Sequence, residues 1–175
     1  MVLQKRRLAV SAGCLCLLLS LIIFFQVDAV TVRLPREGNA ILGAVRVVSG
    51  SEIKLRYRHS VEKTMVEGVF RIGSGPVLQA KETRMTSVGT GLPNTRTATT
   101  RREGQWIVVD EGLTSVPAFD FFISAVNATR LAVDGTAIPV ETLATGSVIR
   151  LDVERVRLVD WLLWRHFKTD WRKER

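Results

Sequence analysis

The chain has 175 residues and a formal net charge of +8. Beyond an apolar N-terminal segment, it has the length of one ordinary domain that can bury a core of its own. The basic excess lies mostly at the two ends, around Lys5 and after Arg165. We therefore expect no nucleic-acid partner for the body of the chain.

The N-terminal segment is uncharged from Leu8 to Phe25 and directly follows Lys5-Arg6-Arg7. Its length approaches the roughly 20 residues that span a bilayer, which favours a retained membrane helix. Val27-Asp28-Ala29 is compatible with signal-peptide cleavage, which is the alternative. Basic residues before the segment orient the domain outward. We predict a signal anchor or signal peptide over residues 1–29, hence a single-pass cell-membrane protein with an extracytoplasmic domain, or a periplasmic protein after cleavage.

Residues 30–157 are predicted to form one all-β domain, a single antiparallel sandwich or small barrel. Apolar and polar residues alternate in short runs separated by turn residues, and both cysteines, Cys14 and Cys16, lie in the N-terminal segment. The domain therefore has no disulfide and no thiolate metal site. The predicted strands are residues 40–48, 53–59, 65–72, 77–86, 106–110, 119–126, 129–133, 137–140 and 147–156.

Residues 158–175 change to a helical period and predict a short basic amphipathic helix. Its apolar residues suit a membrane interface, because indole rings favour the headgroup region and cations attract anionic lipid. The alternative is a helix docked on its own domain through the same apolar stripe. The candidate interface residues are Trp161, Trp164, Phe167 and Trp171.

Residues 89–105 are predicted to form a long loop with few apolar groups. Such a loop is either solvated and mobile, or it is functional, in which case Arg96, Arg101 and Arg102 would meet an anion or an acidic partner. His59 and Glu82 both continue the buried phase of their predicted strands, so we expect them to be near neighbours on one face of the sheet. An ionised carboxylate that faces a core requires a partner, and imidazole is a suitable one.

Four short motifs carry a resemblance to a known family: Tyr57-Arg-His-Ser-Val-Glu62, Val66-Glu67, Glu82-Thr-Arg84 and Gly89-Thr-Gly-Leu-Pro93. Across roughly residues 40 to 156 the chain resembles the bacterial family of domain of unknown function 1850. The resemblance implies association with TRAP-type solute transporters that use TAXI-type binding proteins, and it implies no established activity. The candidate binding residues are His59, Ser60, Glu62, Glu67, Glu82, Arg84, Gly89, Gly91 and Pro93.

The motifs of common hydrolases and metal sites are absent from the sequence, so we expect no enzyme, no cofactor and no metal. The expected function is that of an exported, membrane-attached accessory or binding module. Its expected partners are TRAP transporter membrane or binding subunits and membrane lipid. One alternative is an enzyme that uses His59 with a carboxylate, which would need a pocket joining His59 to a reactive partner. Another is a purely structural envelope protein.

Overall fold

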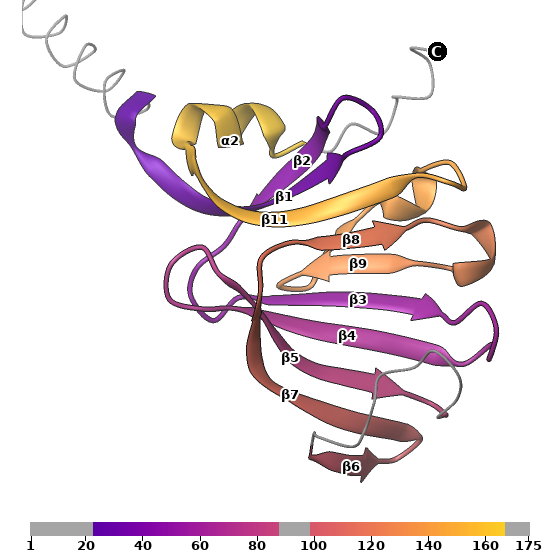
Figure 1. Ribbon diagram of the computed structural model, residues 1–175. Helices are drawn as coiled ribbons and strands as arrows, with labels where there is room; N and C mark the ends of the chain where they lie inside the picture. Colours follow the sequence, from indigo (N-terminus) through magenta and orange to yellow (C-terminus); the bar gives the residue numbers. More distant parts are fainter. Residues whose placement is uncertain (1–22, 88–98, 167–175) are drawn as a thin grey trace, which may run out of the picture.

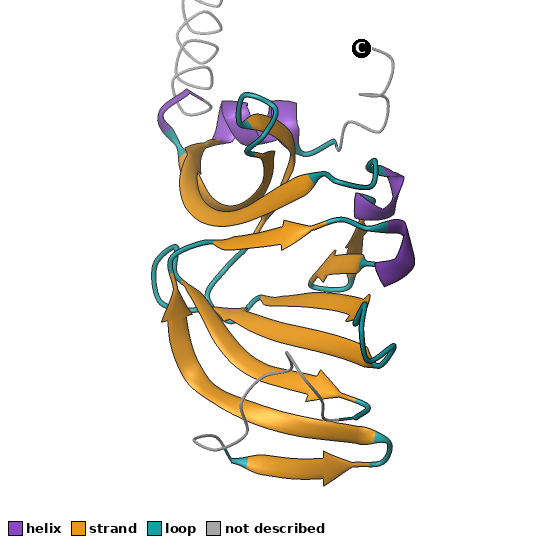
Figure 2. Cartoon of the chain, turned by 45° about the vertical axis from the view of Figure 1, so that its right-hand side comes forward, coloured by secondary structure: helices purple, strands orange, loops and turns teal. Residues whose placement is uncertain are grey.

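Two antiparallel β-sheets and one short helix make up the computed structural model, which describes residues 23–87 and 99–166 (Figures 1 and 2). The smaller sheet has the order β2 (Ala40–Arg46), β1 (Gln26–Leu34), β11 (Val148–Arg157) and β8 (Phe119–Phe122). The larger sheet has the order β10 (Thr136–Ile138), β9 (Arg130–Val133), β3 (Glu52–Arg58), β4 (Met65–Ile72), β5 (Leu78–Met85), β7 (Trp106–Val116) and β6 (Thr100–Glu103). The one-turn helices η1 (Ala125–Asn127) and η2 (Val140–Thr142) flank β9 and β10.

The two sheets pack against each other through one shared hydrophobic core. Ile53 and Leu55 of β3 and Val30 and Val32 of β1 belong to it, and each of these side chains is fully or almost fully buried. Aromatic contacts also join the sheets, since the rings of Phe70 in β4 and Phe119 in β8 are centred 5.2 Å apart. The all-β prediction is confirmed in the form of two sheets.

Most predicted strands match the observed ones within two residues at each end, and Met65–Ile72 matches at both ends, but β8 ends four residues before its predicted end. Two strands were not predicted. β1 adjoins the apolar N-terminal segment, and β6 lies within the predicted loop of residues 89–105. β7 continues six residues beyond Asp110. It does so through Gly112 and Leu113, which both have positive φ angles, so the backbone is irregular just beyond the predicted end of the strand.

The predicted membrane segment runs from Leu8 to Phe25, and its part up to residue 22 lies outside the described residues. Within residues 23–87 and 99–166, no helix has the length and apolar character that a bilayer span requires. The strand β1 begins at Gln26, so the expected domain boundary after residue 29 falls inside a strand. Ala29 is fully buried and pairs with Glu154 of β11, which makes residues 26–29 part of the folded sheet.

The described part of the predicted C-terminal helix is α2 (Leu158–Trp164), and it docks on the smaller sheet (Figure 1). Leu158, Trp161 and Trp164 are partly buried against Val27, Ala29, Ala44 and Val156, on the face of that sheet that points away from the shared core. Trp161 and Trp164 thus pack on the domain, as the docked-helix alternative predicted, while Phe167 and Trp171 lie outside the described residues.

Trp161→Ala is expected to lower the free energy of unfolding by roughly 2 kcal/mol, less than the loss for a fully buried tryptophan because this side chain is partly exposed. The control is Leu163→Ala in the same helix, whose side chain is 72% exposed and whose loss should stay within about 0.5 kcal/mol. Urea titrations of both variants measure the difference. Equal effects would show that the helix does not stabilise the domain through Trp161.

Candidate functional site

The outer face of the larger sheet, which points away from the core, carries a row of charged side chains. In β3, Ile53, Leu55 and Tyr57 face the core, so Lys54 and Arg56 point to the outer face. Strand pairing then aligns residues of four strands across this face. The row consists of Arg130 in β9, Arg56 in β3, Glu67 in β4 and Arg84 in β5.

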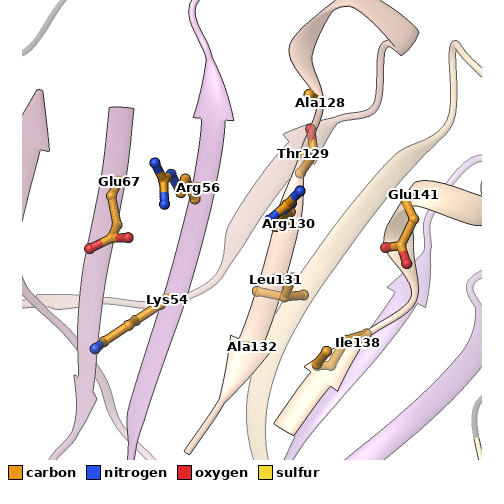
Figure 3. A pocket seen from close by; sticks show the side chains of 11 residues that line it. Lys54, Arg56, Glu67, Ala128, Thr129, Arg130, Leu131, Ala132, Ile138 and Glu141 are labelled. Atoms are coloured by element: carbon orange, nitrogen blue, oxygen red, sulfur yellow. The ribbon is translucent and has the colours of Figure 1, made fainter. Parts of the chain in front are cut away.

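A pocket of about 690 Å³ lies at the β9 end of this row and is open to solvent on one side (Figure 3). Its volume is within the range of small-molecule sites. The lining surface is mainly apolar, and charged groups surround it. The lining residues are Lys54, Arg56, Glu67, Ala128, Thr129, Arg130, Leu131, Ala132, Ala137, Ile138 and Glu141.

The charged side chains of this pocket are available to a ligand. No ion pair within 4.0 Å joins Lys54, Arg56, Glu67, Arg130 or Glu141 to another described residue. The Arg56 guanidinium lies 5.5 Å from the ring centroid of Trp106, a cation–π contact that fixes its position. Figure 3 shows Arg56 extending toward the strand of Glu67 while Arg130 lies over β9.

The segment that leads into β9 is strained and incompletely hydrogen-bonded. Ala128 adopts the left-handed conformation, with φ 45° and ψ 48°. On either side of it, the buried Asn127 Oδ1 and Thr129 Oγ1 have no hydrogen-bond partner among the described residues, and neither has the buried Arg56 Nε. Strained backbone and unpaired buried polar atoms each cost free energy, and such features concentrate at functional sites.

Ala128→Gly is expected to raise the free energy of unfolding by roughly 0.5 to 1 kcal/mol, because glycine adopts positive φ without the steric cost that a Cβ imposes. Ala125→Gly is the matched control, since Ala125 is also exposed but has no positive φ. Its loss of backbone restriction should destabilise the fold instead. Chemical denaturation measures both. If Ala128→Gly lowered the free energy of unfolding, the conclusion that the backbone at Ala128 is strained would be wrong.

A second cluster on the outer face is centred on Glu82 of β5, whose side chain is only 7% exposed. Arg84 Nε donates to Glu82 Oε1 at 2.7 Å, and Arg101 Nη2 of β6 donates to Oε2 at 2.8 Å. Arg101 also bonds Glu103. Burial raises the pKa of Glu82, but the hydrogen bonds from Arg101 and Arg84 outweigh it, so the pKa lies below its ordinary value. Both carboxylate oxygens are satisfied within the fold.

His59 directly follows β3, at the start of the turn that leads into β4. Its backbone N–H donates to the Thr64 carbonyl at 2.8 Å, and its Nδ1 accepts from the backbone N–H of Glu62 at 3.3 Å. Ser60 is exposed, and Lys63 of the same turn has a positive φ of 57°. The imidazole therefore has a local structural role in the turn, and it does not line the pocket described above.

The prediction that His59 and Glu82 are near neighbours is wrong. His59 pairs with Thr64, whereas Glu82 lies opposite Val69, five residues further along β4 and therefore about 16 Å away. The strand register sets this distance, and a β-bulge at Lys81 also changes the face on which Glu82 lies. Ala80 lies opposite Phe70 and Glu82 opposite Val69, so the extra residue moves Glu82 from the core phase to the outer face.

The predicted candidate residues thus separate into several places. Glu67 lines the pocket, Glu82 and Arg84 form the ion-pair cluster, and His59, Ser60 and Glu62 belong to the β3–β4 turn. Gly89, Gly91, Pro93 and Arg96 lie outside the described residues. Arg101 does meet acidic groups, but those groups belong to its own sheet. Among the described residues, no group of three or more acidic, histidine or cysteine side chains has the geometry of a metal site.

Most of the pocket was not predicted from the sequence. The alternation in β3 did place Lys54 and Arg56 on a polar face. Nothing local indicated that Thr129 and Arg130 would lie beside them, because β3 pairs with β9 across a long stretch of chain. Glu141 in η2 carries no sequence signal either.

The match to a family model covers this pocket. The model described as Domain of unknown function (DUF1850) matches residues 53–140, half of the chain, from β3 through β10. The matched segment contains every residue that lines the pocket except Glu141. Neither the curated proteins nor the solved structures gave a match. On the extent of the family match, the chain belongs to the DUF1850 family.

Proposed function

We propose that the chain is a non-enzymatic binding module, exported and attached to the membrane, that acts as an accessory to a TRAP-type solute transporter. The pocket on the outer face carries this proposal. It places charged side chains that form no ion pair with another described residue around a mainly apolar surface, which is the arrangement of a recognition site. The transporter association comes from analogy with the family.

Membrane attachment is supported at the end of the domain where the described chain begins. Phe24 is 79% exposed, Phe25 52% and Ile23 45%, and they continue the apolar sequence that starts at Leu8. The carbonyl of Phe25 accepts a hydrogen bond from the N–H of Leu158, the first residue of α2, and Leu163 in α2 is 72% exposed. Exposed apolar side chains are thus brought to one end of the domain, as a lipid surface requires.

The pocket lies away from that end. It is built by β3, β4, β9 and the residues around η1 and η2, whereas α2 packs on β1, β2 and β11 of the other sheet (Figures 1 and 2). A domain held at the membrane through its first strand and α2 would therefore keep the pocket accessible to a solute or to a neighbouring subunit.

The test is copurification from native membranes. The full chain with a C-terminal affinity tag should stay in the membrane pellet and should recover TRAP transporter membrane or binding subunits, identified by mass spectrometry. A C-terminal reporter that is active only outside the cytoplasm should also be active. Recovery of the chain without transporter subunits would overturn the accessory role, and a cytoplasmic reporter signal would overturn export.

A further inference from the structure

The lining of the pocket on the outer face contains three cations and two carboxylates, so its formal charge is positive. Arg56 and Arg130 are direct cross-strand partners, and like charges in that relation repel each other. Neither forms an ion pair with another described residue, although Glu67 is the partner of Arg56 on its other side. Lys54 adds a third cation to the lining. An anion between the two guanidinium groups would remove the repulsion.

We propose that this pocket binds a small organic carboxylate with an apolar body, held by Arg56 and Arg130 through the carboxylate and by the apolar lining through the body. This inference rests on the binding-module function proposed above. Planar guanidinium groups match the geometry of a carboxylate and form charge-assisted hydrogen bonds with it. The Arg56 guanidinium is already held over Trp106, so less side-chain freedom is lost on binding.

Thr129 supplies an independent indication of a ligand. This residue is only 4% exposed and lines the pocket, and its Oγ1 has no hydrogen-bond partner in the part of the chain that the structure describes. A buried hydroxyl without a partner is costly, and a bound carboxylate oxygen would accept its hydrogen. The adjoining strain at Ala128 fixes the backbone at this point.

The rest of the lining requires an apolar group on the ligand. Ala132 and Ala137 present apolar surface on one side of the pocket, with the buried Leu131 and Ile138 behind them, and an inorganic anion would leave the alanine surface in water. A second depression of about 240 Å³ shares Ala128, Thr129 and Glu141 with the pocket and extends the available space. Glu67 and Glu141 border the pocket and would disfavour ligands with several negative charges.

Titration of the full chain in zwitterionic lipid nanodiscs tests the proposal, with isothermal calorimetry as the readout and empty nanodiscs as the blank. Four probes separate the contributions: hexanoate, acetate, inorganic phosphate and hexylammonium. Hexanoate should bind saturably and at least about tenfold more tightly than acetate or phosphate, and its affinity should fall with added salt. Hexylammonium should not bind.

The variants locate the site. Arg56→Gln and Arg130→Gln should each weaken hexanoate binding about tenfold or more, while Arg102→Gln, which alters an exposed arginine of β6, should leave it unchanged. Thr129→Val should weaken binding without lowering the melting temperature of the free protein, because it removes a hydroxyl that has no partner. If Thr129 had a purely structural role, Thr129→Val would lower the melting temperature and leave hexanoate binding unchanged.

Three outcomes would overturn the inference. They are absence of hexanoate binding, equal binding of phosphate, and binding of hexylammonium as tight as that of hexanoate. If any of these occurs while the tagged chain still recovers transporter subunits, the ligand class is wrong and the accessory function stands. If hexanoate binds as expected and no subunit copurifies, the accessory function fails and the binding site stands.

Discussion

Replacing Arg84 and Arg101 together by methionine is expected to lower the free energy of unfolding by roughly 2 to 3 kcal/mol at pH 7. The double substitution leaves the buried carboxylate of Glu82 without its hydrogen-bond donors, and breaking a buried pair in this way typically costs about 3 to 5 kcal/mol. The expected loss is smaller because the two arginine side chains are 31% and 42% exposed, so solvent already screens the interaction.

The pH dependence of stability distinguishes this cause from a general loss of packing. In the native protein the pKa of Glu82 is lowered on folding, so its stabilising contribution is present above the ordinary pKa and is lost as the pH falls through the lowered value. Without the two arginines, burial alone acts and raises that pKa. The double variant should then become more stable relative to the native protein as the pH falls from 7 toward 4.

Urea titrations at several pH values give this difference. Arg150→Met is the matched control, because its partner Asp120 has a side chain that is 47% exposed, and solvent screening should make its effect on stability much smaller. Adding Glu82→Gln to the double variant removes the buried carboxyl group. The gain in stability of the double variant at low pH should then disappear. A constant offset between pH 4 and 7 would contradict the assignment of the effect to Glu82.

A chain that begins at Val30 is expected to be less stable by about 3 kcal/mol or more than a chain that begins at Gln26. Residues 26–29, which only the longer chain contains, form the first half of β1, in which Val27 and Ala29 are buried and pair with Val156 and Glu154. Their removal exposes α2 and Val156 to water and breaks several strand hydrogen bonds. Arg155 also loses its ion pair with Asp28.

The comparison uses two otherwise identical chains, one beginning at Gln26 and one at Val30. Melting temperature and denaturant midpoint measure the difference, and amide hydrogen exchange in β11 should rise only in the shorter chain. Equal stability would mean that residues 26–29 contribute nothing to the sheet. The expected result disfavours export with cleavage after Ala29, because the product would lack half of a central strand.

The sequence predicted the local elements well where alternation was undisturbed. β3 and β4 keep a period of two with apolar residues on one face, and their limits were found within one residue. β1 has no such alternation, because Val30, Thr31 and Val32 are buried in succession between the core and the α2 side. β6 consists of exposed residues throughout and therefore has no hydrophobic pattern to detect.

The candidate site was predicted less well, and the reasons are long-range. Insertion of Lys81 as a bulge reverses the phase of β5, which alternation alone cannot reveal. The pairing of Arg56 with Arg130 depends on β9 joining β3, and neither segment contains information about the other. The sequence indicated which acidic and basic residues could bind a ligand. It did not indicate which of them lie together in one site, because that depends on the register of the sheet.

The exposed strand β6 also limits how molecules of this protein can associate. It forms one end of the larger sheet, where its sequence Thr100-Arg101-Arg102-Glu103 presents charged side chains on both faces. A sheet edge with free backbone groups normally invites another chain to add a strand, which is a route to aggregation. Arg101 is paired with Glu82 and Glu103, but Arg102 makes that addition less favourable for a second copy, because the same cation on each copy would approach the new junction. Copies concentrated at one surface would thus stay separate along this edge.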